Sequence, residues 1–95
     1  MRSVGARRVS QLQVTFIRGR PIVAYYRFRE PSRRRVQRTE ELEPGLVVDF
    51  ARDGRPLGVE IVDPPLTTMA AMNRVLRRLK QSRVTRRDMK PLRVS

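Results

Sequence analysis

Apolar and polar residues alternate most clearly over residues 46–61, where two alternating runs flank Asp53 and Gly54. Two such runs around an Asp-Gly pair are the strongest short-range signal of a β-hairpin with a tight turn. Because side chains alternate between the two faces of a strand, this turn pairs Val48 with Val59 on one face. The pattern therefore predicts a structural turn at Asp53 and Gly54 and a hairpin with one apolar face. The other residues of that face are Leu46, Phe50, Leu57 and Ile61.

A second alternating segment lies upstream, at residues 12–16, and is followed by turn-forming residues at 18–21. Residues 22–28 are rich in the β-branched and aromatic residues that favour strands, so the two segments predict a first hairpin. Residues 36–42 predict a short third strand, and Pro44-Gly45 marks the turn before the second hairpin. Beyond these two successive hairpins the sequence shows no internal repeat.

Pro56 constrains the second hairpin because proline has no amide hydrogen to donate. Its predicted position opposite Ala51 points its nitrogen away from the hairpin partner. No further strand could receive a hydrogen bond there, so residues 57–62 are expected to form an edge of the sheet. An edge strand of this kind invites the addition of a strand from a second chain.

An amphipathic helix is predicted from Thr67 or Thr68, either of which can cap its first turn, to about Gln81. One side of this helix is apolar and is expected to cover the sheet, and the opposite side is basic. The apolar side carries Met69, Met72, Val75, Leu76 and Leu79, and the basic side carries Arg74, Arg77 and Arg78.

These elements predict an α+β fold, in which two β-hairpins form an antiparallel sheet of four or five strands and one C-terminal helix packs on one face. Residues 10–82 are expected to form this single domain. Residues 1–9 are predicted to be a basic flexible arm, and residues 83–95 a basic flexible tail.

The chain has 95 residues, no Cys and no His. A domain of this size has a small core and often needs a disulfide, a metal or a second subunit. Without Cys a disulfide is excluded, and we expect a homodimer. No apolar run approaches the roughly 20 residues that span a bilayer, and no secretory signal begins the sequence, so we expect a cytoplasmic protein without a membrane partner.

The net charge is +13, and basic flanks surround a nearly neutral centre. Such a charge attracts polyanions, including nucleic acid. Arginine supplies almost all of the basic residues, and two explanations stay open: a binding role or the codon bias of a GC-rich genome. The candidate polyanion-binding residues are Arg33, Arg34 and Arg35 in a loop and Arg74, Arg77 and Arg78 on the helix.

No residue pattern indicates catalysis. Asp49 and Glu60 lie diagonally on the polar face of the second hairpin, and either a solvated, ion-paired surface or a metal-assisted site would use them. No His can activate a nucleophile, and no glycine pattern resembles a phosphate-binding loop. We therefore expect a protein that is not an enzyme, with no catalytic residues, no metal ligands and no cofactor.

Aromatic and basic residues interleave at Tyr25, Tyr26, Arg27 and Phe28. Aromatic side chains on a sheet with flanking Arg can stack nucleic-acid bases and hold phosphates. Because successive residues of a strand face opposite ways, Tyr26 and Phe28 can equally form part of the core.

The segments Glu40-Glu41-Leu42-Glu43-Pro44-Gly45, Asp53-Gly54-Arg55 and Leu57-Gly58-Val59-Glu60-Ile61 resemble the YuzE-like family of small bacterial proteins, a domain of unknown function. The resemblance covers about residues 14–63. The chain departs from the family pattern at Arg18-Gly19-Arg20-Pro21, where the family turn is usually acidic, and at Ala51, where the family has a second Asp. The resemblance implies an antitoxin-like protein, as in some members that are encoded beside a small toxin, and it provides no catalytic residues to carry over to this chain.

These observations favour a small non-enzymatic interaction module, antitoxin-like in its binding of a toxin-like partner protein. The alternative is a nucleic-acid-binding protein that uses the basic helix face and the basic arms.

Overall fold

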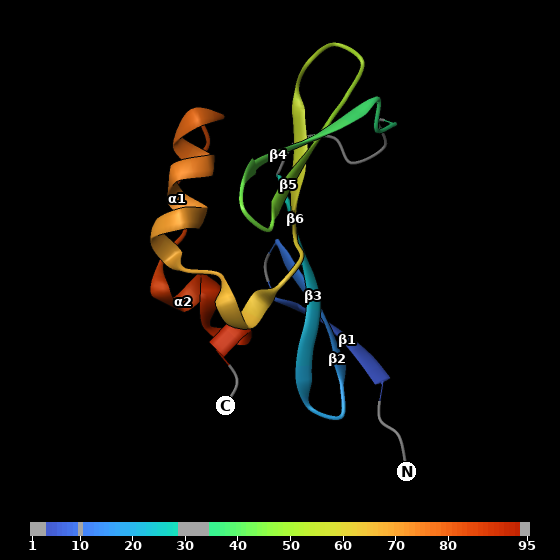
Figure 1. Ribbon diagram of the computed structural model, residues 1–95, viewed down its shortest axis with the longest axis vertical. Helices are drawn as coiled ribbons and strands as arrows, with labels where there is room; N and C mark the ends of the chain where they lie inside the picture. The colour runs from blue at the N-terminus through green and yellow to red at the C-terminus, as the bar shows by residue number, and fades with distance from the viewer. Residues whose placement is uncertain (1–3, 10, 29–34, 94–95) are drawn as a thin grey trace.

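The structure is a computed structural model that describes residues 4–9, 11–28 and 35–93. It contains a six-stranded antiparallel sheet with all of its helical segments on one side (Figure 1). The strands are β1 (Val4–Val9), β2 (Leu12–Ile17), β3 (Arg20–Arg27), β4 (Arg38–Glu43), β5 (Leu46–Phe50) and β6 (Pro56–Ile61). The helical segments are the 3-10 turn η1 (Pro64–Leu66), α1 (Met69–Arg78), α2 (Arg86–Met89) and the 3-10 turn η2 (Lys90–Arg93).

The sheet consists of two three-stranded meanders that meet edge to edge. Its strand order is β1-β2-β3-β6-β5-β4, so the third strand of each meander lies at the centre and the first strand lies at an edge. The junction between β3 and β6 is short and runs from the pair Ala24–Ile61 to the pair Arg27–Gly58. This order relates the meanders by an approximate twofold axis through the junction, perpendicular to the sheet.

Matching irregularities occur in the two meanders. The ladder between β2 and β3 shifts after Thr15, and the ladder between β5 and β6 shifts after Asp49. After each shift a phenylalanine lies opposite a proline, Phe16 opposite Pro21 and Phe50 opposite Pro56. A backbone hydrogen bond beside the junction also occurs in both meanders. Arg27 N donates to Gln11 O in the first, and Val62 N donates to Gly45 O in the second.

Aligned through these pairs, residues 12–26 match residues 46–61 in sequence, with Asp53 as the one inserted residue. The two successive hairpins were predicted from the sequence, but this repeat was not. The insertion of Asp53 changes the spacing between equivalent residues from 34 to 35, so no single spacing relates the two copies. The identical pairs are Leu12 and Leu46, Val14 and Val48, Phe16 and Phe50, Arg18 and Arg52, Gly19 and Gly54, Arg20 and Arg55, and Pro21 and Pro56.

The hairpin between β5 and β6 pairs Val48 with Val59, as its alternation predicts. Its loop is longer than predicted, because Ala51 N donates to Arg55 O at 2.8 Å and encloses three residues instead of two. Gly54 has a φ of 90°, a conformation that costs glycine little. A loop of three residues with glycine last is usually followed by a bulge, which is why Pro56, and not Leu57, lies opposite Phe50.

The prediction that residues 57–62 form an edge is wrong, because β6 lies between β3 and β5. Pairing with β3 reaches only as far as Leu57, whose carbonyl accepts from Phe28 N at 3.0 Å. Pro56 precedes this contact, so its missing amide hydrogen does not interrupt the junction. The edges of the described sheet are β1 and β4.

Both ends of the chain are more structured than predicted. Residues 4–9, expected to be a flexible arm, form β1, which pairs with β2 through backbone hydrogen bonds that need no apolar pattern. Within residues 83–95, expected to be a flexible tail, lie α2 and η2. Val84, Met89 and Leu92 are each 2% exposed and belong to the core. The sequence did not predict these helical turns, because each has only four residues and a hydrophobic period cannot be recognised over so short a segment.

The helix α1 begins after Thr68, whose side chain accepts from Ala71 N at 3.0 Å. It ends at Arg78, short of the predicted Gln81, and Lys80 has a φ of 58° just beyond it. Among the described residues no helix is long and apolar enough to cross a membrane.

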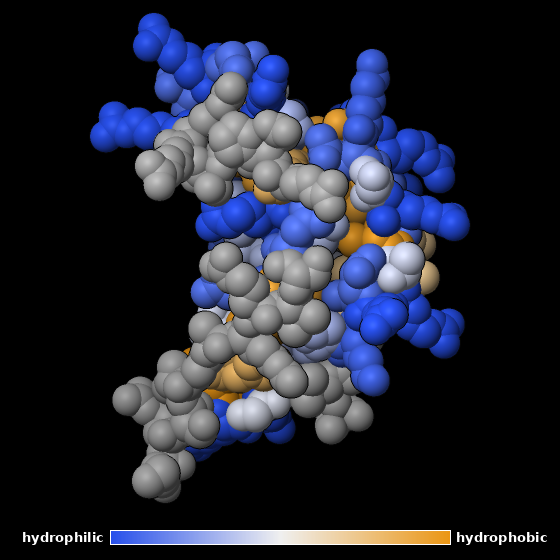
Figure 2. Space-filling view, turned by 180° about the vertical axis from the view of Figure 1, so that it is seen from behind, coloured by the Kyte–Doolittle hydropathy of each residue, from blue (hydrophilic) through white to orange (hydrophobic). Residues whose placement is uncertain are grey.

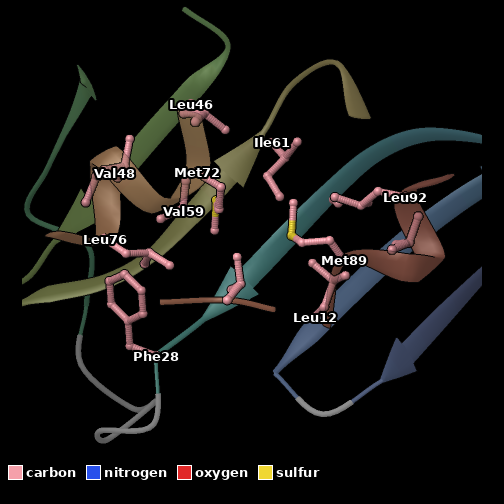
Figure 3. Packing of buried hydrophobic residues seen from close by; sticks show 14 of the residues in the cluster. Leu12, Phe28, Leu46, Val48, Val59, Ile61, Met72, Leu76, Met89 and Leu92 are labelled. Carbon is pink, nitrogen blue, oxygen red and sulfur yellow. The ribbon is translucent and has the colours of Figure 1, made fainter. Parts of the chain in front are cut away.

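The core lies between the sheet and the helical segments. Met72 and Leu76 of α1 are fully buried and lie beside the apolar side chains of β5 and β6, while Met89 and Leu92 lie nearer β2 (Figure 3). The α+β class is therefore confirmed. The described sheet has six strands where four or five were predicted, because β1 was missed. It is accompanied by a second short helix, α2, that was taken for tail.

Val59 is fully buried at the centre of this core, and replacing it with Asp is expected to unfold the protein. A carboxylate at this position would lie in an apolar environment without a partner, which costs more than the few kcal/mol, roughly 3–5, that a core of this size supplies. Thermal or urea denaturation followed by circular dichroism measures the effect. Val62→Asp is the matched control, because Val62 is 49% exposed and its replacement should leave the melting temperature nearly unchanged.

Candidate functional site

One face of the sheet is packed against the helices, and none of the helical segments that the structure describes lies on the opposite face (Figure 1). We call this opposite side the open face. Its side chains alternate with the buried ones along β2 to β6, and they are a mixture of polar, charged and apolar groups. They belong to Gln13, Thr15, Val23, Tyr25, Arg27, Thr39, Glu41, Val47, Asp49, Glu60 and Val62, with Gly58 among them.

Tyr25 is the central side chain of the open face. Its hydroxyl donates to Asp49 Oδ2 at 3.0 Å, across the intervening strand β6. The phenol ring lies over Gly58, where even a Cβ atom would overlap with the ring. The guanidinium carbon of Arg27 lies 5.6 Å from the ring centroid on the same strand. Gly58 therefore has a specific role, because its missing side chain makes room for the ring.

The pKa of Tyr25 is raised above its ordinary value, first because the phenol is partly buried. The negative charge of Asp49 and its hydrogen bond with the hydroxyl raise the pKa further, while Arg27 opposes the shift. The pKa of Tyr26, on the other face of β3, is raised by burial and by the charge of Asp88. Both phenols are therefore neutral at physiological pH, and Tyr25 serves as a hydrogen-bond donor.

A shallow cavity of about 260 Å³ adjoins Tyr25 on the side away from Asp49. Val23 and Ala24 contribute apolar atoms to it, and the remaining lining is polar. The polar lining residues are Gln13, Thr15, Tyr25, Arg27 and Glu60.

Asp49 and Glu60, the carboxylates considered for a metal-assisted site, both lie on the open face, but Asp49 is bound by Tyr25. In the part of the chain that the structure describes, no three metal-ligating side chains come together. Gly58 lies directly opposite Asp49 in the ladder between β5 and β6. An aromatic residue and an acid on the polar face, with a glycine between them, is the signal that could have revealed the contact.

The basic residues proposed for polyanion binding divide into different groups in the structure. Arg74 binds Glu43 through two hydrogen bonds, of 3.1 and 3.3 Å, which raise the pKa of the arginine and lower the pKa of the glutamate. Arg78 Nη1 donates to the carbonyl of Leu42 at 3.5 Å. These two residues therefore connect α1 to β4, although both are exposed, as Arg77 is.

The loop arginines are only partly described. Arg33 and Arg34 lie outside the described residues, and Arg35 is exposed beside the tip of the β5–β6 hairpin. Of the described candidates, Arg35 therefore lies at the hairpin tip, whereas Arg74, Arg77 and Arg78 lie on α1.

The aromatic residues of β3 do not form an exposed row. Phe28 is 3% exposed in the core, and the ring of Tyr26 packs edge-on against it at 5.9 Å. Tyr25 alone of the three lies on the open face, and its ring covers Gly58. The core interpretation of Tyr26 and Phe28 is confirmed, and stacking of successive bases on these three residues is not supported.

Gly58→Ala tests the contact with Tyr25. The added methyl group would displace the phenol ring, so we expect the free energy of unfolding in urea to fall by about 1–3 kcal/mol. In a Tyr25→Ala background the same change should cost less than about 1 kcal/mol, because alanine in a strand is otherwise no worse than glycine. Equal losses in the two backgrounds would show that the ring does not depend on this glycine.

The raised pKa of Tyr25 predicts a loss of stability at alkaline pH. An unfolded tyrosine ionises near pH 10, whereas the folded phenol retains its proton, so this contribution is complete below about pH 10 and disappears as pH rises toward the folded pKa. Phenolate absorbance of the folded protein should therefore appear later than that of the unfolded chain. Asp49→Asn should lower the pKa of Tyr25, and Tyr25→Phe isolates the signal of Tyr26.

A family model described as a protein of unknown function (DUF2283) matches residues 23–63. The matched segment includes β4, β5, β6 and the last five residues of β3, and thus Tyr25, Asp49 and Gly58. No curated protein and no solved structure is significantly similar to the chain. Over the residues that build the open-face contact, the chain is therefore similar to a family of proteins whose function is unknown.

Proposed function

We propose that this protein is a non-enzymatic interaction module that binds another protein through its open face, in the manner of the antitoxin half of a toxin–antitoxin pair. The observation that carries the proposal is a broad sheet surface that none of the described helices covers. Apolar side chains lie on it, and one of them, Val62, is 49% exposed. The proposal takes the family of unknown function that matches residues 23–63 to be YuzE-like.

The charge of the open face favours a basic partner. Among the described side chains of this face, the acidic residues Glu41, Asp49 and Glu60 outnumber the basic residue Arg27, whereas the protein as a whole has a net charge of +13. Two copies that stacked their open faces would bring these acidic groups together, and like charges in contact are unfavourable. The surface therefore suits a different protein with basic and apolar side chains better than a second copy. The proposed homodimer would need another surface.

The helix side supports nucleic-acid binding as a second candidate function. Arg77, Arg86 and Arg87 are exposed there, and hydrophilic side chains dominate the surface seen in Figure 2. Against this candidate, Arg74 and Arg78 are held by groups of the chain itself. Exposed arginines on short helices support a salt-dependent attraction to polyanions more than recognition of a sequence.

Site-specific photo-crosslinking in native cells distinguishes the two candidates. A photoreactive amino acid at Val62 should crosslink to one protein, whereas the same group at Arg77 on the helix side should not. Glu60→Lys should reduce the Val62 crosslink at least about fivefold, because it reverses a charge on the binding surface. Glu40→Lys, on the edge strand β4, is the matched control and should leave the yield unchanged.

Two outcomes would contradict the proposal. The first is equal crosslinking from Val62 and Arg77, or a Val62 crosslink that ignores Glu60→Lys. The second is crosslinking from Arg77 to RNA or DNA that weakens steeply with salt, which would favour the nucleic-acid function.

A further inference from the structure

The approximate twofold axis passes through the pair formed by Tyr25 of β3 and Glu60 of β6, so these two residues occupy equivalent positions on the open face. The same axis relates Gly58 to Val23, because Asp49 pairs with Gly58 and Thr15 pairs with Val23 just before the matching ladder shifts. The open face thus contains two equivalent half-sites, one on each side of the axis.

The first half-site is filled by the chain itself. Its floor is the backbone at Gly58, its wall is the carboxylate of Asp49, and its occupant is the phenol of Tyr25. The ring reaches this position from the neighbouring strand, and its hydroxyl donates to the wall at 3.0 Å. The first half-site therefore accommodates a phenol, whose ring lies on the floor and whose hydroxyl donates to the wall.

The second half-site is the cavity of about 260 Å³ beside Tyr25. Val23 forms its floor, Thr15 stands where the first half-site has Asp49, and Glu60 stands where the first has its aromatic ring. The chain therefore supplies polar groups to the wall of this half-site, but it places no ring on the floor as Tyr25 does in the first half-site.

The difference between the floors decides from where a ring can enter. At Gly58 a ring can rest on the backbone, as that of Tyr25 does. At Val23 the side chain occupies this level, so a ring must rest higher, on the valine methyl groups. A ring carried by another molecule can approach from above the sheet, and it would bury apolar area against Val23 and pack beside Tyr25.

We propose that the second half-site receives a tyrosine side chain of the partner protein, with its ring on Val23 and its hydroxyl hydrogen-bonded to Thr15, the counterpart of Asp49. This inference rests on the proposed function, since the tyrosine belongs to the protein that binds the open face. Tyrosine is preferred to phenylalanine because a buried ring edge without a hydroxyl would leave the polar wall without a partner.

Titration with N-acetyl-tyrosinamide, monitored by amide and methyl NMR, tests the half-site without the partner protein. The signals of Thr15 and Val23 should shift in a saturable way, and N-acetyl-phenylalaninamide should bind about 2–10-fold more weakly. Thr15→Val should remove this preference. Thr39→Val, which makes the same change on the open face outside the cavity, should preserve it.

A second variant fills the half-site from within the chain. Val23→Gly combined with Glu60→Tyr reproduces the floor and the ring of the first half-site, and it should abolish the shifts caused by the tyrosine probe. Absence of saturable shifts, or a tyrosine preference that survives Thr15→Val, would overturn the inference. If the Val62 crosslink nevertheless behaves as proposed, the open face binds a partner by other contacts. Failure of the crosslink alone would leave a phenol site without the proposed function.

Discussion

The structure depends on the short antiparallel junction between β3 and β6. Each meander alone is a small three-stranded sheet, and four residue pairs, from Ala24–Ile61 to Arg27–Gly58, combine them into one surface. The junction makes the apolar faces of both meanders continuous, so that one layer of helices can cover them. On the opposite side it places Tyr25 beside Gly58 and within reach of Asp49, which adds a hydrogen bond across the centre of the sheet.

The helical layer needs both helix α1 and the C-terminal segment. Met72 and Leu76 pack over one part of the sheet, and Met89 and Leu92 extend the core toward β2. On the exposed side of α1, Arg74 forms an ion pair with Glu43 of β4. A basic residue that holds two elements together contributes to the net charge as much as one that binds a polyanion does. Composition alone therefore could not separate the structural arginines from those that are open to a partner.

The parts of the fold that follow from local pattern were predictable, and the parts that follow from distant pairing were not. The alternation around Asp53 and Gly54 predicted the register of β5 and β6 from the pair Leu46–Ile61 to the pair Asp49–Gly58. The pair at Phe50 differs because the loop is one residue longer and a bulge follows it. The position of β6 in the sheet was missed because Pro56 has the chemistry of an edge residue, although it lies just outside the junction. The contact between Tyr25 and Asp49 needs that junction and so could not be seen from either hairpin.

The repeat gives physical meaning to positions where its two copies differ. Several residues of the turns and of the buried face are identical in the two copies, as at Gly19 and Gly54, because both meanders need a positive φ in the loop and an apolar face toward the helices. On the open face, by contrast, glycine is replaced by valine and tyrosine by glutamate. These exchanges change neither the register nor the core, since the side chains point away from both. The ring of Tyr25 fills one half-site, and the other half-site remains a cavity. These differences between the two copies therefore change the surface that is available to a partner.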